Sequence, residues 1–195
     1  RTFAGRSFGA DGTAVGELVF NTSMTGYQEI LTDPSYHGQI VNMTYPLIGN
    51  YGVNDEDVES CCPRVEGFVT REYCPYPSNW RSNQSLQAYL QEHGIVALTE
   101  VDTRAVTRHI RRAGAMRAVI AAGDHDVDQL REQAAAWPGL VGRDLVSEVT
   151  CDQAYEWTEP CAWRPPPAGD PRFHVVACDF GIKYNILRYL VSSGC

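Results

Sequence analysis

The chain has 195 residues and a net charge of −8 at pH 7, with 44% hydrophobic and 21% charged residues. Its length suffices for one complete domain and part of another. Its composition is that of an ordinary globular protein. No apolar run approaches the ~18 residues of a membrane span. An acidic chain without a basic block also argues against nucleic acid, whose binding depends on neutralised phosphates. We therefore expect neither nucleic acid nor membrane as a partner.

The seven cysteines indicate reduced thiols and a cytoplasmic location. Their number is odd, two are adjacent, and no pair has the C-x-x-C spacing of a zinc or redox motif. The N-terminus also lacks the apolar core of a secretory signal. Cys178 lies within an apolar run, and we expect it to be a small buried side chain. The seven are Cys61, Cys62, Cys74, Cys151, Cys161, Cys178 and Cys195.

The first fifty residues favour short strands around a polar segment. Strands are predicted over residues 17–20 and 39–43, where ELVF and QIVNM suit a pleated surface. Residues 25–31 predict a turn of helix, which Pro34 ends because the residue before a proline disfavours helical backbone. Residues 21–36 are rich in hydroxyls and amides. They suit either hydrogen bonding to a small polar ligand or a well-capped surface loop.

The middle of the chain alternates strands and helices. Strands are predicted over residues 65–71, 95–98 and 116–120. One helix carries Leu86 and Leu90 on its apolar face and ends before Gly94. Another begins at the N-cap Asp102 and ends near Gly114. A third begins at Asp126, where Gln129 has the spacing of a capping box. The second helix also carries four arginines, which we interpret as a solvated or ion-paired face: Arg104, Arg108, Arg111 and Arg112.

The last part of the chain resembles a linker followed by the start of a new unit. Residues 149–172 include three successive prolines, which fit neither a central strand nor a helix interior. Residues 173–195 then predict a strand over 175–177, a tight turn over 179–181 and a helix. These are the first elements of an α/β domain, and a βαβ unit needs ~30 residues or more. We therefore divide the chain into a domain over 1–150, a linker over 151–172 and a truncated second domain over 173–195.

No general catalytic template is matched. The nucleophile elbow G-x-S-x-G and the phosphate-binding glycine motifs are absent. The five histidines lack metal-ligand spacing, so a surface or core role is the better interpretation for each. Ser35 has no base near it in the sequence.

Five segments in order resemble the small, glutamine-hydrolysing subunit of carbamoyl-phosphate synthase. The most specific is FNTSMTGYQEILTDPSY, residues 20–36, within a resemblance that covers residues 15–54. It continues over residues 66–98, 101–116 and 146–158. Finally, HVVACDFGIKYNILRYLVSSGC, residues 174–195, is similar to the opening of the family's class I glutamine amidotransferase domain.

The resemblance implies an α/β fold and a defined chemistry. The expected architecture is a swivelling β/β/α N-terminal domain, followed by the first βα unit of a Rossmann-like amidotransferase domain. In the family, a cysteine nucleophile with a His–Glu pair releases ammonia from glutamine through a glutamyl thioester. The ammonia passes to the large synthetase subunit, which makes carbamoyl phosphate for arginine and pyrimidine synthesis. The resemblance places ATP, Mg and bicarbonate on that partner and no cofactor on this chain.

Of the family's site residues, only Ser35 transfers to this chain, as a contact for L-glutamine. Cys195, in SSGC, does not match the G-x-C-x-G elbow of the nucleophile, so we assign no catalytic residue and expect the isolated chain to be inactive. Arg117 stands where the family often has glycine. The alternative function is a non-catalytic docking or scaffold domain for the synthetase subunit.

Overall fold

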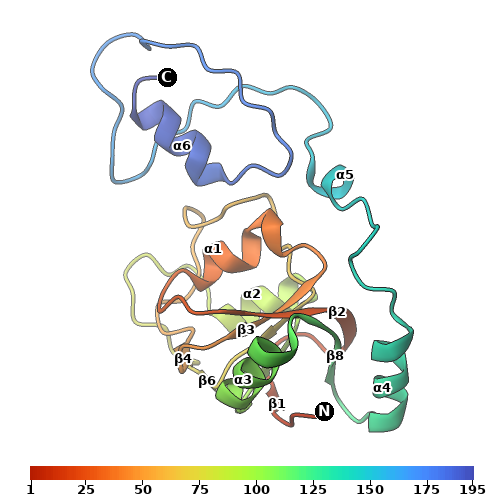
Figure 1. Cartoon of the computed structure of the whole chain (residues 1–195). Coiled ribbons are helices and arrows are strands. Elements are labelled where there is room, and N and C mark those ends of the chain that lie inside the picture. The colour runs from red at the N-terminus through yellow and green to blue at the C-terminus, as the bar shows by residue number, and fades with distance from the viewer.

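A computed structural model describes residues 1–195. A six-stranded sheet of order β1-β7-β5-β3-β2-β8 forms the centre of an N-terminal lobe, residues 1–122 (Figure 1). The four inner strands are parallel, and the edge strands β1 and β8 are antiparallel to their neighbours. The strands are β1 (Arg6–Ser7), β2 (Gly12–Asn21), β3 (Gln39–Met43), β5 (Gly67–Val69), β7 (Val96–Thr99) and β8 (Met116–Ala122). A separate parallel pair joins β4 (Leu47–Ile48) to β6 (Glu72–Tyr73).

Helices cover both faces of this sheet. Successive residues of a strand point to opposite faces. Val41 and Phe68 accordingly belong to one apolar cluster, which includes residues of α1 (Tyr27–Thr32) and α2 (Leu86–Glu92). Their neighbours Ile40 and Val69 belong to a second cluster, which includes Val106 of α3 (Thr103–Ala113). Burial on both faces explains why the parallel strands are apolar almost throughout.

The helices α2, α3 and α4 (Val127–Ala136) begin and end close to the predicted residues. Asp102 caps α3 by accepting a 2.9 Å hydrogen bond from the Ala105 N–H. Asp126 caps α4 through the Asp128 N–H at 2.8 Å, whereas Gln129 makes no return bond, so only half of the capping box forms. The predicted strand over residues 65–71 is confirmed only for its centre, β5. The predicted strands over 17–20 and 39–43 are confirmed within β2 and as β3.

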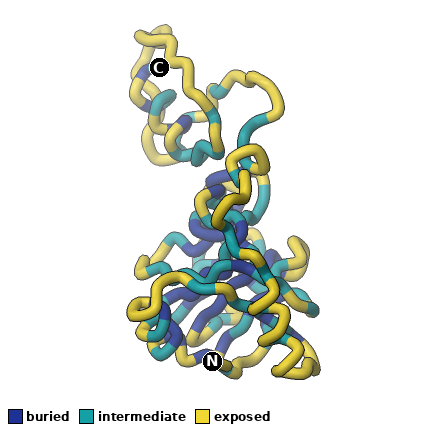
Figure 2. The backbone as a smooth tube through the Cα atoms, turned by 45° about the vertical axis from the view of Figure 1, so that its right-hand side comes forward, coloured by how far each residue is buried: buried dark blue, intermediate teal, exposed yellow.

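The C-terminal segment, residues 150–195, contains one helix in an otherwise irregular chain. Most of this segment is exposed (Figure 2). The predicted helix is confirmed as α6 (Tyr184–Ser192). The predicted strand over 175–177 is wrong: these residues form no ladder, and Val176 is 82% exposed. The expected burial of Cys178 is also wrong, because this residue is exposed. No neighbouring strand is available in the chain to pair the backbone of this run.

The structure is therefore a mixed α/β fold, as predicted. The division at residues 150 and 172 stays a prediction, as do the swivelling and Rossmann-like architectures. A short helix, α5 (Val146–Val149), connects α4 to the C-terminal segment. None of the helices is both long enough and apolar enough to cross a membrane.

Candidate functional site

Ser35 lies in a short 3-10 turn, η1 (Pro34–Tyr36), that closely follows α1. The Asp33 carboxylate caps this turn by accepting a 2.9 Å hydrogen bond from the Ser35 N–H. Pro34 is buried at the first position, where its missing N–H is no disadvantage. Ser35 is exposed, and its hydroxyl makes no hydrogen bond to the rest of the chain. The turn thus presents an available hydroxyl on a fixed backbone.

A second turn, residues 179–183, leads into α6 and is organised by Asp179. Its Oδ1 accepts hydrogen bonds from the N–H groups of Gly181 (2.9 Å) and Ile182 (2.8 Å). Its Oδ2 accepts a 2.6 Å bond from the Tyr155 hydroxyl. Burial raises the pKa of Asp179, but the bonds from Ile182, Tyr155 and Gly181 outweigh that effect and leave the pKa lowered. Burial and this carboxylate together raise the pKa of Tyr155.

The two turns are in direct contact. Gly181 has a φ of 93°, which disfavours any side chain. A Cβ atom there would lie 3.2 Å from Pro34 Cβ and 2.8 Å from Cγ2 of Val149 in α5. Lys183 adds an ion pair, with its Nζ 3.4 Å from Asp33 Oδ2. The turn that carries the exposed serine therefore adjoins the turn that begins the last helix.

The short helix α5 also contacts the η1 turn. His37 is the C-cap of η1, and its Nε2 lies 2.8 Å from Glu148 Oε2. Arg143 approaches the other oxygen of this carboxylate at 3.5 Å. The hydrogen bond from His37, together with the Arg143 charge, lowers the pKa of Glu148. The η1 turn is thus held by contacts from two separate parts of the chain, the 179–183 turn and the α5 region.

Glu59 connects the N-terminal lobe to α6. Its carboxylate Oε2 accepts a 3.0 Å hydrogen bond from the Asn185 N–H, and Oε1 accepts a 2.7 Å bond from Asn185 Nδ2. Its backbone carbonyl accepts a 3.0 Å bond from the Tyr184 N–H. Arg188 reinforces the contact, since its Nη1 donates a 2.8 Å bond to the carbonyl of Val58. The first turn of α6 therefore rests on the loop that precedes β5.

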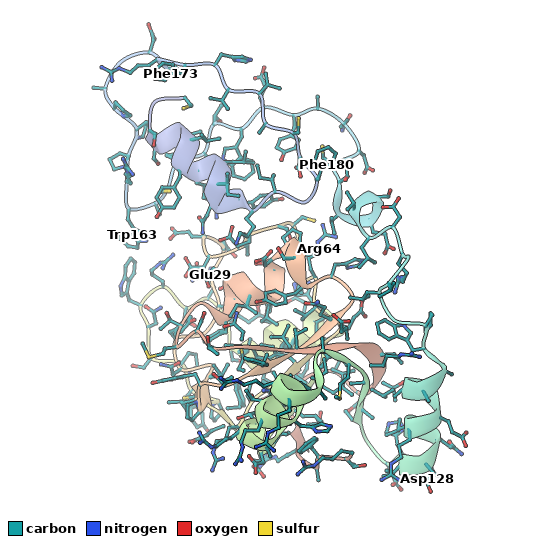
Figure 3. All side chains as sticks on the ribbon, viewed as in Figure 1. Glu29, Arg64, Asp128, Trp163, Phe173 and Phe180 are labelled. Carbon is teal, nitrogen blue, oxygen red and sulfur yellow. The ribbon has the colours of Figure 1, made fainter.

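Further carboxylates lie on the face of the N-terminal lobe toward α6, where Figure 3 labels Glu29. Glu29 Oε2 is buried without a hydrogen-bond partner. Burial raises the pKa of Glu29, and the charges of Asp57 and Glu59 add to this effect. Arg81 offsets part of the charge through 2.7 Å ion pairs with Glu56 and Asp57. The negative charge on this face is therefore only partly compensated.

The arrangement can bind a small polar molecule but contains no assembled nucleophile and base. Ser35, predicted as a binding residue, is brought beside the 179–183 turn. Its hydroxyl can both donate and accept a hydrogen bond. Cys195 follows α6 and belongs to no such pair. No group of three or more His, Cys, Asp or Glu side chains is arranged to hold a metal ion. The sequence did not reveal Glu59, because one buried acid cannot be distinguished within the acidic run over residues 55–59.

Comparisons of the sequence with known proteins show the family of this chain. The family model described as carbamoyl-phosphate synthase small chain, CPSase domain, matches residues 1–120. The carbamoyl phosphate synthase small chain of Syntrophotalea carbinolica is 58% identical over 200 residues, covering 100% of this chain and 53% of the relative. That of Thermosynechococcus vestitus is 54% identical over 198 residues, covering 99% and 52%. That of Escherichia coli K12 is 52% identical over 202 residues, covering 99% and 52%. The chain thus spans about half the length of these curated relatives.

Proposed function

Because the chain belongs to the carbamoyl-phosphate synthase small-chain family, we propose that it forms the N-terminal half of a glutamine-hydrolysing subunit. That subunit would release ammonia from L-glutamine and deliver it to the large synthetase subunit as its partner. The large subunit would combine ammonia with bicarbonate and ATP to make carbamoyl phosphate. We assign ATP and Mg to the large subunit and no cofactor to this chain.

Within that subunit, we assign the binding of glutamine to Ser35. The carrying observation is the close approach of Gly181 to Pro34, which sets the turn that bears the exposed Ser35 next to the turn that leads into α6. A hydroxyl suits the α-amino or α-carboxylate group of an amino acid, because it both donates and accepts. Ser35 would thus hold the end of glutamine that does not react.

The chemistry explains why this contact should act on binding. A thiolate attacks the side-chain amide, ammonia leaves, and water hydrolyses the glutamyl thioester. Backbone N–H groups stabilise the negative charge that develops on the amide oxygen when the thiolate adds to the carbon. A hydrogen bond to the distant α-substituents is the same in the ground state and the transition state. Such uniform binding lowers KM without raising kcat.

The test replaces Ser35 by alanine in the complete subunit assembled with its synthetase partner. Loss of one hydrogen bond of about 1.4 kcal/mol should raise the KM for glutamine about tenfold. The kcat at saturating glutamine should be nearly unchanged, as should synthesis from added ammonia. Ser78→Ala serves as the matched control, because Ser78 is also an exposed serine and lies in a loop after β6.

The alternative function, a non-catalytic docking domain, predicts a different result. An unchanged KM in Ser35→Ala would remove the substrate contact and favour that alternative. The 195-residue chain alone should release no ammonia from glutamine. Turnover by the pure chain that disappears on replacing Cys195 would overturn the assignment of no catalytic residue.

A further inference from the structure

We propose that Glu59 is a positioning residue that fixes the start of α6 to the end of α1, and so holds the 179–183 turn against the Ser35 turn. The mechanical part of this inference stands on contacts within the chain. Its kinetic part deepens the proposed function and rests on it.

The backbone of Glu59 is tied to α1. Its N–H donates a 2.9 Å hydrogen bond to Oγ1 of Thr32, the last residue of that helix. The same hydroxyl donates a 2.9 Å bond to the carbonyl of Gln28 one turn earlier. Thr32 and Gln28 are both almost completely buried, and Glu59 is 7% exposed. Glu59 therefore cannot shift without disturbing the helix that ends three residues before Ser35.

The carboxylate of Glu59 supplies the cap that α6 lacks. The N-cap residue Lys183 makes no side-chain hydrogen bond to the helix. The first N–H groups of a helix have no partner within it and require an outside acceptor. A carboxylate there also faces the positive end of the helix dipole. Glu59 meets both needs through its bonds with Asn185 and Tyr184.

These contacts form a closed ring next to the η1 turn. The ring runs from Thr32 to Glu59, then to the first turn of α6, and returns through the ion pair between Lys183 and Asp33. Asp33 in turn caps the backbone of Ser35. Figure 1 shows α6 on the α1 side of the lobe. Moving α6 away would break both hydrogen bonds between the Glu59 carboxylate and Asn185 and would remove the acceptor from the first turn of the helix.

Arg188 cannot replace this function. Its contact with the N-terminal lobe ends at the backbone carbonyl of Val58, and its Nε bonds to Glu159 of the C-terminal segment itself. It therefore attaches α6 to the loop, whereas Glu59 and the ion pair between Lys183 and Asp33 connect α6 with the end of α1. Loss of the Glu59 carboxylate should loosen the first turn of α6 and leave the sheet intact.

The first arm of the test is hydrogen exchange on the 195-residue chain. In Glu59→Gln, the side chain keeps one oxygen that can accept a hydrogen bond from Asn185, and the other oxygen becomes an NH2 group, which cannot. The backbone N–H groups of residues 184–188 should therefore exchange about tenfold faster. Exchange in β3 and β5 should be unchanged. Glu132→Gln is the matched control, because Glu132 is an exposed glutamate on α4. Exchange in residues 184–188 that stays within about twofold of the unmodified chain would overturn the proposal.

A second variant leaves the N-terminal lobe untouched. Asn185→Asp places a carboxylate against that of Glu59 and removes the Nδ2 donor. It should accelerate exchange in α6 at least as much as Glu59→Gln, even if the latter variant folds poorly. If the amides of residues 184–188 exchanged at the wild-type rate in Asn185→Asp, the proposed attachment of α6 through Glu59 would be contradicted directly.

The second arm measures kinetics in the complete subunit with its partner. Glu59→Gln should raise the KM for glutamine about tenfold, like Ser35→Ala, with kcat and ammonia-dependent synthesis unchanged. If Glu59→Gln loosened α6 without changing the KM for glutamine, the positioning role in glutamine binding would be overturned. The structural attachment of α6 to α1 through Glu59 would still stand. If Ser35→Ala also left KM unchanged, the proposed substrate contact itself would be wrong. The two failures are thus distinguishable.

Discussion

Two apolar β-type runs in this chain adopt opposite states. In β3, Ile40 and Val41 are 1% and 0% exposed, with strands on both sides and helices above and below. In the C-terminal segment, Val175 and Val176 are 46% and 82% exposed, and no strand forms. The residue types are nearly the same. The difference shows that a parallel strand depends on its neighbours for hydrogen bonds and cover, more than on its own β propensity.

The largest expected difference in stability is between two variants that each lose a phenylalanine, one in the N-terminal lobe and one in the C-terminal segment. Phe68 is fully buried in the cluster under α1 and α2, so Phe68→Ala should destabilise the N-terminal lobe by about 3–5 kcal/mol. Phe180 is 67% exposed, and Phe180→Ala should change the free energy of unfolding by less than about 0.5 kcal/mol. Urea denaturation followed by circular dichroism measures both. Similar effects of the two variants would contradict the contrast.

An intermediate effect is expected where the two regions touch. Gly181→Ala introduces a side chain at a φ of 93° and directs it toward Pro34 and Val149. The left-handed backbone alone disfavours alanine by about 1–2 kcal/mol. Hydrogen exchange in α6 should increase, whereas the sheet should be unaffected.

Gly169→Ala is the control for this contact, because Gly169 also has a positive φ, 104°, but has open space around it. It should leave the exchange of α6 unchanged. If both variants loosened α6 equally, backbone strain rather than the approach to Pro34 would be the cause.

The effect of acid on stability should have opposite signs at Asp179 of the C-terminal segment and at Glu29 of the N-terminal lobe. The folded pKa of Asp179 is lowered by its hydrogen bonds, so its contribution is present above the ordinary carboxyl pKa of about 3.9. That contribution is lost as the pH falls through the lower folded value. The folded pKa of Glu29 is raised, chiefly by burial. Glu29 therefore weakens the fold at neutral pH, and this penalty fades as the pH falls toward the unfolded pKa.

Two variants separate these signs. Glu29→Gln should raise the urea midpoint at pH 7 and have less effect at pH 4. Asp179→Asn should accelerate hydrogen exchange in α6 at pH 7 and abolish the acid dependence of that exchange. If the increase in the urea midpoint caused by Glu29→Gln became larger on acidification, the direction assigned to the pKa shift of Glu29 would be wrong.

The smallest expected effect lies at the edge of the N-terminal lobe. Arg117 Nη1 donates hydrogen bonds to the carbonyls of Ala135 (3.1 Å) and Trp137 (2.8 Å), at the end of α4. Arg117→Gly should destabilise α4 by about 0.3–1 kcal/mol, the usual contribution of a cation at a helix C-terminus. Hydrogen exchange should rise in the last turn of α4 alone. Faster exchange in β2 as well would show that Arg117 also supports the sheet.

Much of the N-terminal lobe could be predicted, because local patterns and tertiary packing agree there. The cap at Asp102 and the strand over residues 39–43 are examples. The strand over residues 175–177 could not be excluded from its apolar pattern, since pairing is a property of the sheet. At the site, the resemblance indicated Ser35. Glu59 could not be found, because the Asn185 that its carboxylate binds is 126 positions away in the sequence.

The most direct test of the account is a structure of the complete parent subunit with glutamine bound and hydrolysis blocked at its nucleophile. We predict Ser35 Oγ within about 3 Å of the α-amino or α-carboxylate group of glutamine. The η1 turn should still contact Gly181 in that complex. A glutamine whose polar groups are all satisfied elsewhere, with Ser35 Oγ farther than about 4 Å and no bridging water, would contradict the account.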